Sequence, residues 1–301
     1  MINELSILIP VFNFDIRPLV ATLHQQCQQL AITFEIRCAD DGSHPEIITR
    51  NLAIRSFSHT GYEVLPRHLG RVAIRNKLAR DARYHYLLFL DNDSQVIHPD
   101  FIRNYLQAGT VSPVVLGGTC YQAQEPALPY RLHWYYGRTR EERPAARRCQ
   151  APYQSFNLNN IFIARAIFLR FPLQPLIRGY GHEDSRFGQA LQLAGIPVRH
   201  LDNPVLHAGL VPAGLFLEKS RQAIENLYWL YTHEGTGADT RLLRTYRLLK
   251  KFKLLAPFQA VYQASETWII KQLQGPGPWL WLFDIYKLYH FTRQARQQEE
   301  K

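Results

Sequence analysis

Over its first hundred residues the chain alternates short apolar runs with helical patterns, which is typical of a parallel sheet with right-handed crossovers. Two of the runs end in acidic residues: 33–39 leads into Asp40-Asp41-Gly42-Ser43, and 86–90 leads into Asp91-Asn92-Asp93. In such sheets ligands bind beyond the carboxyl ends of the strands. We therefore expect the two acidic clusters to share one site.

The pattern changes twice further along the chain. The tract 131–150 carries six arginines and reads as a loop, and from about residue 212 every segment reads as helical. We expect an α/β domain at 1–210 and a helical, basic and aromatic extension at 211–301. The other expected strands are 5–9, 61–65, 156–164 and 196–206, and the expected helices are 15–30, 70–83, 183–194, 213–231 and 241–255.

The composition limits the class of protein. The 301 residues are 46% apolar, which is enough for a continuous core and excludes a disordered chain. The four cysteines form no CxxC pair, so neither a disulfide framework nor a zinc site is expected. No window of eighteen apolar residues occurs, and the N-terminal residues do not form a secretory signal. We expect a cytoplasmic protein.

The net charge of +10 is concentrated at the C-terminal end. Residues 241–301 hold eleven Lys/Arg against four Asp/Glu, whereas the first 240 residues hold 24 against 21. The segment Arg241–Leu255 mixes leucines with basic residues, as in a helix that lies on an anionic membrane surface. The alternative is a helical extension packed on the catalytic domain or on a second protomer of a homodimer. The aromatic residues expected at the level of the lipid headgroups are Trp268, Trp279, Trp281, Tyr286 and Tyr289.

The acidic clusters each allow a functional and a structural interpretation. Asp91 and Asp93 lie two residues apart after a strand and point the same way, so they suit Mg²⁺ or Mn²⁺ bridging a diphosphate. Alone they are equally compatible with an acidic turn. Asp40 and Asp41 could accept hydrogen bonds from a nucleobase and a ribose hydroxyl, or form an ordinary Asp-Gly turn.

A third acidic pair precedes an expected helix. Glu183-Asp184 follows Gly179-Tyr180-Gly181-His182 and either caps the helix or presents a general base to an acceptor hydroxyl. His207 ends an extended run and is either a structural histidine or a metal ligand that completes Asp93. The basic residues on the helix at 70–83 face either phosphates or solvent; they are Arg71, Arg75 and Lys77.

Taken in this order, the motifs resemble those of family 2 glycosyltransferases with the GT-A fold. The resemblance implies a Rossmann-like, mixed but mostly parallel sheet flanked by helices. It makes residues 1–210 the catalytic domain, with a nucleotide-binding half at 1–100 and an acceptor half at 101–210. It also implies inverting transfer of a sugar from a nucleotide sugar, UDP-linked by family frequency, to a hydroxyl of a glycan or lipid-linked acceptor in bacterial cell-surface polysaccharide synthesis. The processive motif Gln-x-x-Arg-Trp is missing, which favours a single addition. The matching residues are Ile9–Asn13, Asp40–Ser43, Arg75-Asn76, Leu90–Asp93, Gly117-Gly118, Asn159-Asn160, Glu183-Asp184 and His207.

The resemblance also implies roles for single residues. Asp184 would be the catalytic base and Glu183 would orient the acceptor. Asp93 and His207 would hold Mn²⁺ or Mg²⁺ on the diphosphate. The residues expected to bind the nucleotide sugar are Pro10, Asn13, Asp40, Asp41, Arg75, Asp91 and Asn92. Those expected to bind the acceptor are Gly118, Asn159, Asn160 and Tyr180.

Three other functions fit parts of the sequence. A nucleotidyltransferase would need a Gly-rich basic loop after the first strand, where Pro10-Val11-Phe12-Asn13 stands. A degenerate scaffold that binds nucleotide sugars without transferring them would not need Asp93 or Asp184, and it remains the alternative to the enzyme. Nucleic-acid binding is suggested by the pI of about 9.5 alone, and no recognition motif supports it.

Overall fold

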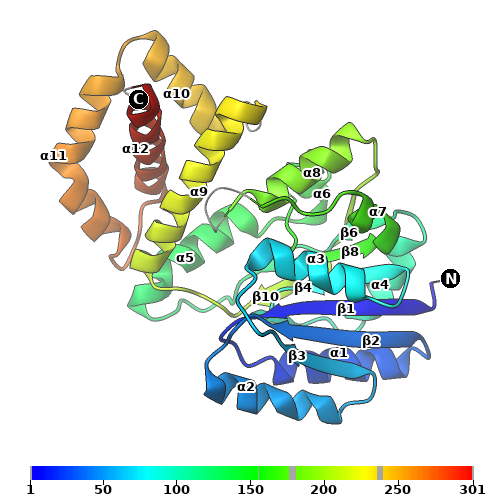
Figure 1. Cartoon of the computed structure of the whole chain (residues 1–301). Coiled ribbons are helices and arrows are strands. Elements are labelled where there is room, and N and C mark those ends of the chain that lie inside the picture. The colour runs from blue at the N-terminus through cyan, green and yellow to red at the C-terminus, as the bar shows by residue number, and fades with distance from the viewer. Residues whose placement is uncertain (1, 155, 176–180, 236–239, 300–301) are drawn as a thin grey trace. The chain divides into compact units, whose positions relative to one another are not determined.

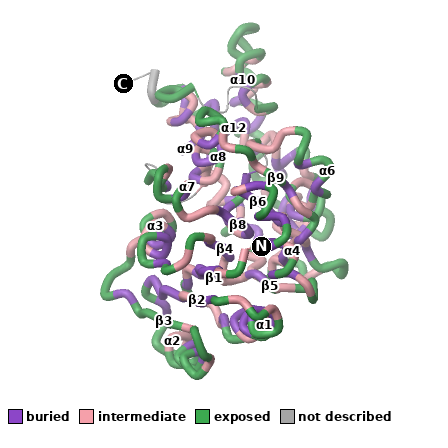
Figure 2. The backbone as a smooth tube through the Cα atoms, turned by 90° about the vertical axis from the view of Figure 1, so that its right-hand side faces the viewer, coloured by how far each residue is buried: buried purple, intermediate pink, exposed green. Residues whose placement is uncertain are grey.

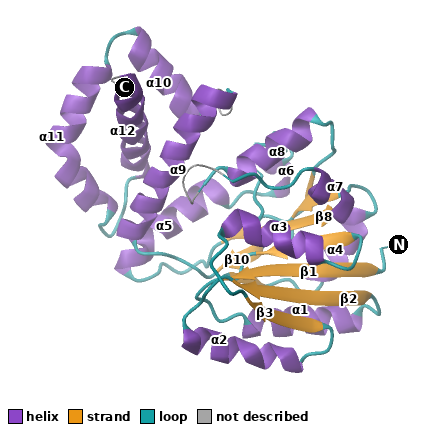
Figure 3. Ribbon diagram, viewed as in Figure 1, coloured by secondary structure: helices purple, strands orange, loops and turns teal. Residues whose placement is uncertain are grey.

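The computed structural model describes residues 2–154, 156–175, 181–235 and 240–299, which form two compact units. The first unit comprises the described residues of 1–122, 141–175 and 183–209. The second comprises those of 123–140, 176–182 and 210–301. The first unit combines the strands with helices that flank them, and helices make up the second (Figure 3).

A seven-stranded sheet with the order β3-β2-β1-β4-β8-β6-β9 is the centre of the first unit (Figure 1). Neighbouring strands are parallel except around β8, which is antiparallel to both β4 and β6. Three further strands form a second, small sheet of order β5-β10-β7. The strands of the large sheet are β1 Glu4–Val11, β2 Thr33–Asp40, β3 Thr60–Val64, β4 Tyr86–Leu90, β6 Val114–Leu116, β8 Asn160–Ala164 and β9 Arg199–His200. Those of the small sheet are β5 Ser94–Val96, β7 Thr119–Cys120 and β10 Val205–His207.

Helices cover both faces of the large sheet, so its central strands are buried and read as continuous apolar runs. Ile7 of β1 packs with α1 and α4 on one face, whereas Leu8 packs with α3, α7 and α8 on the other. Both residues are fully buried, and burial is continuous over residues 5–9 of β1 and 87–90 of β4 (Figure 2). The helices of this unit are α1 Arg17–Gln29, α2 Pro45–Asn51, α3 Arg71–Asp81, α4 Phe101–Gly109, α6 Ala145–Arg148, α7 Arg165–Arg170 and α8 Glu183–Leu193, with a 3₁₀ turn at Leu52–Ser56.

The second unit is helical. Leu217, Tyr262 and Phe283 share one apolar cluster, and Leu243 and Phe291 belong to a second one. Among the residues that the structure describes, no helix combines the length and apolar character needed to cross a bilayer. The helices of the second unit are α5 Arg131–Tyr136, α9 Ala213–Glu234, α10 Arg241–Lys251, α11 Leu255–Leu273 and α12 Leu280–Glu299, with a 3₁₀ turn at Leu128–Tyr130 and a π-helical turn at Gly137–Glu141.

The mixed α/β architecture and the C-terminal helices are as the sequence predicts, but three segments differ. The tract 131–150 is largely helical, because Leu132 and Trp134 give it a buried apolar face. The sequence predicted a loop here because of the many arginines, one of which, Arg140, pairs with Asp284 at 3.0 Å. The strand predicted at 156–164 starts only at Asn160. The run predicted at 196–206 contains two very short strands, β9 and β10, instead of one.

The aromatic residues of the tail divide into two groups. Tyr286 and Tyr289 are each only 5% exposed and lie in the core of the helical unit, so their predicted place at the lipid headgroups is wrong. Trp268, Trp279 and Trp281 are about half exposed.

Candidate active site

Three parallel strands, β1, β2 and β4, end at the same edge of the large sheet. β1 pairs with β2 along its whole length and with β4 on its other side. The loops that follow these strands are joined by hydrogen bonds. Asn13 N–H donates to Ser43 Oγ at 2.7 Å, and Asn92 Nδ2 donates to Phe12 O at 3.0 Å. The two acidic clusters therefore lie at one edge, on either side of the end of β1.

Asp40 holds the turn that follows β2. Its Oδ1 accepts hydrogen bonds from the backbone N–H groups of Gly42 (3.1 Å) and Ser43 (2.7 Å), and its Oδ2 accepts one from Tyr62 Oη (2.5 Å). Asp40 is fully buried, and burial together with this hydrogen bond raises the pKa of Tyr62. Both carboxylate oxygens of Asp40 therefore accept hydrogen bonds from other residues of the chain. A contact between Asp40 and a nucleotide stays a prediction.

Asp41 fixes the loop that leads into α3. Its two oxygens accept hydrogen bonds from the N–H groups of Leu69 (2.6 Å) and Gly70 (2.9 Å), and the residue is only 4% exposed. Pro10 and Asn13, the other residues predicted for the nucleotide, lie at and just beyond the end of β1. Asn13 is exposed and Pro10 is half-buried. Access to solvent at this edge is therefore greater at Asn13 than at either aspartate.

Arg75 of α3 pairs with Asp91. A guanidinium nitrogen of Arg75 donates to Asp91 Oδ1, and another donates to Arg71 O at 3.1 Å. Arg75 is 4% exposed, and its Nε finds no acceptor among the described residues. A buried guanidinium beside the first carboxylate of the Asp-x-Asp motif provides positive charge at the edge where a diphosphate would bind.

Asp93 lies beside His207. β10 is antiparallel to β5 with His207 opposite Ser94, which brings His207 Nδ1 within 3.6 Å of Asp93 Oδ2. Burial acts to raise the pKa of Asp93, but the hydrogen bond and charge of His207 outweigh it and the pKa is lowered. For His207, burial acts to lower the pKa and Asp93 raises it, with a net increase. A Cβ on Gly209 would overlap the Asp93 carboxylate, so a glycine is needed there.

Glu183 and Asp184 begin α8. Glu183 Oε1 pairs with Arg71 Nε at 3.1 Å, and Asp184 Oδ2 accepts a hydrogen bond from Leu158 N–H at 3.2 Å. Burial, followed by the neighbouring charge of Glu183, raises the pKa of Asp184 to about 7, against the opposing charges of Arg75 and Arg71. Asp184 is therefore a carboxylate that can exchange a proton near neutral pH.

The residues predicted for the acceptor occupy different environments. Asn160 is buried: its Oδ1 accepts from Tyr105 Oη (2.5 Å) and its Nδ2 donates to Gly118 O (2.8 Å). Asn159 Nδ2 donates to Thr119 Oγ1 at 2.7 Å. Asn160 therefore supports the backbone around Gly118. Tyr180 lies outside the described residues.

A family model for glycosyl transferase family 2 matches residues 6–168, which is more than half of the chain. The chain belongs to glycosyl transferase family 2. It is therefore a glycosyltransferase, as the resemblance of its motifs implied.

Solved structures of other glycosyltransferases share the fold. The mannosyltransferase PcManGT from Pyrobaculum calidifontis, in complex with GDP-Man and Mn²⁺, is 12% identical, with a TM-score of 0.60 over 98% of this chain and 87% of that one. Glucosyl-3-phosphoglycerate synthase from Mycobacterium tuberculosis, in complex with Mg²⁺ and UDP, is 16% identical, with a TM-score of 0.52 over 75% and 79% of the two chains. No curated protein matches the sequence. The predicted GT-A fold of this family 2 glycosyltransferase is confirmed.

From the sequence, Arg71 was expected to face either phosphates or solvent, and its pairing with Glu183 was not predicted, although its spacing of four from Arg75 places both on one face. Two further residues around the site of this glycosyltransferase were not identified from the sequence. Gly209 follows His207 by two residues, but only the structure shows its contact with Asp93. Arg148 lies in the tract interpreted as a loop, and its guanidinium donates to three backbone carbonyls beside the turn at Gly117, those of Leu116, Gly117 and Leu201.

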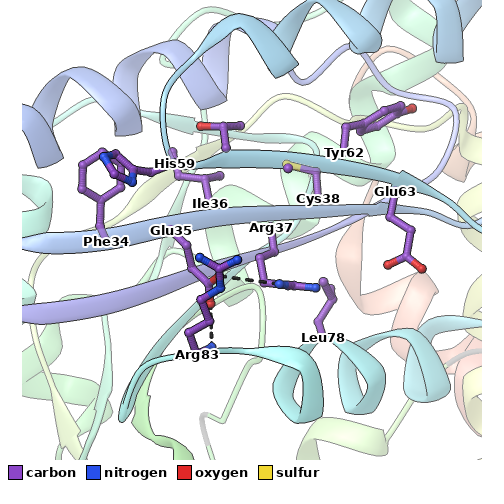
Figure 4. A pocket seen from close by; sticks show the side chains of 12 residues that line it. Phe34, Glu35, Ile36, Arg37, Cys38, His59, Tyr62, Glu63, Leu78 and Arg83 are labelled. Atoms are coloured by element: carbon purple, nitrogen blue, oxygen red, sulfur yellow. Dashed lines mark hydrogen bonds and ion pairs between the residues drawn. The ribbon is translucent and has the colours of Figure 1, made fainter.

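A cavity of about 350 Å³ lies elsewhere in this unit, against β2 and β3 (Figure 4). Arg37 and Arg83 lie within 3.6 Å of Glu35 there, and Leu78 of α3 contributes to the wall. None of the residues predicted for the site of the glycosyltransferase lines it. It is therefore separate from the acidic edge of the sheet.

Proposed function

We propose that this glycosyltransferase moves a sugar from a nucleotide sugar, UDP-linked, to a hydroxyl of a glycan or lipid-linked acceptor, with inversion at the anomeric carbon. The observation that carries the proposal is the carboxylate of Asp184, whose pKa is raised to about 7 at the start of α8. Arg71 and Arg75 of α3 connect this acidic pair to Asp91, which places the base and the donor motif around one helix.

The donor set supports a divalent metal that is shared with substrate. Asp93, just before β5, lies beside His207 at the end of β10, and no group of three or more potential ligands occurs among the described residues. Mg²⁺ commonly takes one or two protein ligands and completes its shell with phosphate oxygens and water. Asp93 and His207 fit that arrangement, and they would hold Mn²⁺ or Mg²⁺. Such an ion neutralises negative charge that develops on the leaving diphosphate.

The chain's own residues would perform the remaining chemistry. The Asp184 carboxylate accepts the proton of the acceptor hydroxyl while the acceptor oxygen forms its bond to the anomeric carbon. The bond from that carbon to the diphosphate oxygen breaks in the same step, so the nucleoside diphosphate leaves and the configuration inverts. Glu183, held by Arg71, orients the acceptor, and Arg75 stabilises the departing negative charge.

The solved relatives support the choice of donor and metal. Their structures contain GDP-Man with Mn²⁺ and UDP with Mg²⁺. We place the nucleotide at residues 1–100 and the acceptor at 101–210, with cell-surface polysaccharide as the product. We also propose that residues 241–291 bring the enzyme to the inner face of the cytoplasmic membrane. A homodimer through the same extension is the competing arrangement.

Nucleotide release tests the reaction. A panel of UDP- and GDP-sugars is incubated with the full chain and Mn²⁺ or Mg²⁺, and the nucleoside diphosphate is quantified. We expect release from one donor, dependent on metal, with a smaller release in chelator. No release from any donor, together with tight nucleotide-sugar binding, would support the degenerate scaffold instead.

A further inference from the structure

The outer face of α11 carries an exposed apolar stripe. Pro257, Val261, Ala264 and Trp268 recur every three or four residues, so they line one side of the helix. All four are exposed, Val261 by 69% and Trp268 by 52%. These values are unusual for apolar side chains that share one helix face, because soluble proteins seldom leave contiguous apolar patches open.

The stripe is not needed for the packing of the helical unit. The opposite side of α11 supplies the buried residues Tyr262, Ile269 and Leu273, and Tyr262 stacks on Tyr289 of α12 with ring centroids 3.8 Å apart. The acid on α11, Glu266, lies two residues from both Ala264 and Trp268. Because each residue turns the helix by about 100°, Glu266 lies on the side away from the stripe.

Exposed aromatic and apolar residues extend the stripe at both ends. At one end Trp268 lies 6.2 Å from Trp279, which stacks on Trp281 at 5.9 Å, and both are about half exposed. At the other end Phe252 is 63% exposed and Leu254 is 47% exposed in the turn between α10 and α11. The stripe with these two ends forms one apolar surface, which we name the α11 face.

Basic residues gather at the Phe252 end of the α11 face. Residues 240–265 contain six Lys/Arg and no Asp/Glu. Four of the six, Arg247, Lys250, Lys251 and Lys253, are exposed at the end of α10 and in the turn. By contrast, Leu243 and Tyr246 of α10 are buried, so the face of α10 that they form packs inside the helical unit.

We infer that the α11 face docks on an anionic phospholipid surface. This inference rests on the proposed membrane contact of residues 241–291 and assigns it to one side of one helix. Charge complementarity decides the occupant: a cluster of lysines without acids attracts anionic headgroups, at about 1 kcal/mol for each basic residue near the surface. The apolar stripe enters the headgroup boundary, and the tryptophans lie at the level that their amphipathic rings prefer.

Vesicle flotation of the full chain tests the inference. Vesicles of phosphatidylcholine with phosphatidylglycerol are compared with vesicles of phosphatidylcholine alone, at low and high salt. We expect binding to the anionic vesicles only, weaker at high salt. Val261→Glu and Trp268→Glu should each weaken that binding by about tenfold or more, since each puts a charge where apolar surface enters the lipid.

Gln263→Glu is the matched control, because it adds the same charge to α11 two residues from Val261, off the stripe. It should bind vesicles like the wild type. Equal binding by the stripe variants and the wild type would overturn the inference, as would a wild type that ignores anionic vesicles. A wild-type dimer that Trp268→Glu dissociates, without lipid binding, would assign the α11 face to a second copy instead.

Nucleotide release without vesicles is measured for each variant. Retained release shows that a variant is folded. It also separates the two proposals, because vesicle binding without any release would contradict only the proposed reaction.

Discussion

A carboxylate that must remove a proton near neutral pH needs surroundings that oppose its charge without abolishing it. Asp184 meets both needs: burial and Glu183 disfavour its charged form, while Arg71 and Arg75 limit the effect. A general base works best when its pKa lies near the working pH. The raised pKa of Asp184 is therefore the property that most directly links one residue to the proposed reaction.

Asp184→Asn should leave the fold intact and lower kcat by about 10²–10⁴-fold, which is the usual contribution of a general base. In the wild type, kcat/KM should rise as pH increases towards about 7 and then level off, because the base acts only when it is deprotonated. Transfer rates over pH 5–9 measure both effects. Asp100→Asn, a half-buried aspartate directly before α4, serves as the control. Normal turnover in Asp184→Asn would remove this residue from the role of base.

The close approach of Gly209 to Asp93 allows a test of the proposed metal site. Gly209→Ala should displace the Asp93 carboxylate and weaken metal-dependent nucleotide release by about tenfold or more, since misplacing a catalytic group by about 1 Å costs as much as 10²-fold. Titration of release against Mn²⁺ should show a higher half-saturating concentration. Gly214→Ala, where the added Cβ meets only Gln274 Nε2 at 3.9 Å, should behave like the wild type.

Among the elements, α3 connects most of the site. Through Arg71 it contacts the start of α8, and through Arg75 it contacts the loop after β4. Its own start is held by Asp41. One helix therefore sets the relative positions of the donor motif and the acidic pair.

The hydrogen bond between Tyr62 and Asp40 in the turn after β2 should contribute to the stability of the fold. Tyr62→Phe removes the hydroxyl that donates to buried Asp40, so it should lower the free energy of unfolding by about 1–3 kcal/mol. Urea denaturation measures the change. Tyr84→Phe, at a half-buried position in the same unit, is the control and should cost less. A stable Tyr62→Phe variant would mean that Asp40 finds another donor.

Strands and helices with a clear pattern of apolar residues were predictable from the sequence. Elements that depend on contacts between residues distant in the sequence were not. The strand at 86–90 matches β4 residue for residue because its apolar run is buried on both faces. The 131–150 tract was misinterpreted because its arginines hide a short apolar face. In the site, the identity of Asp93 and His207 followed from a resemblance, but their pairing depends on the antiparallel register of β5 and β10, which no local pattern encodes.

In the molecule as a whole, positive charge is distributed unevenly along the chain. The first 240 residues are nearly balanced and contain the acidic edge, whereas residues 241–301 carry most of the positive charge. The three tryptophans that are about half exposed, Trp268, Trp279 and Trp281, all belong to the tail, although exposed apolar side chains such as Val111 and Leu193 also occur in the first 240 residues.

The pH dependence of folding should report on Asp184. Between the ordinary pKa of an aspartate, 3.8, and about 7, the folded state binds a proton at Asp184 that the unfolded chain has lost, so this group lowers stability as pH rises. Asp184→Asn lacks that titration. The melting temperature of the variant minus that of the wild type should therefore increase from pH 4 to pH 7 and stay level above it. A difference that is constant with pH would contradict the raised pKa.

The pairing of Asp93 with His207 also has a consequence for synthesis. The two residues are 114 positions apart in sequence, and β10, which carries His207, is the middle strand of the small sheet. A nascent chain that has completed β1 to β4 has the strands at the nucleotide edge but neither the histidine nor the strand that positions the loop of Asp93. Under the proposed metal site, an incomplete chain would therefore not cleave a nucleotide sugar, because His207 is among the last residues of that site to be made.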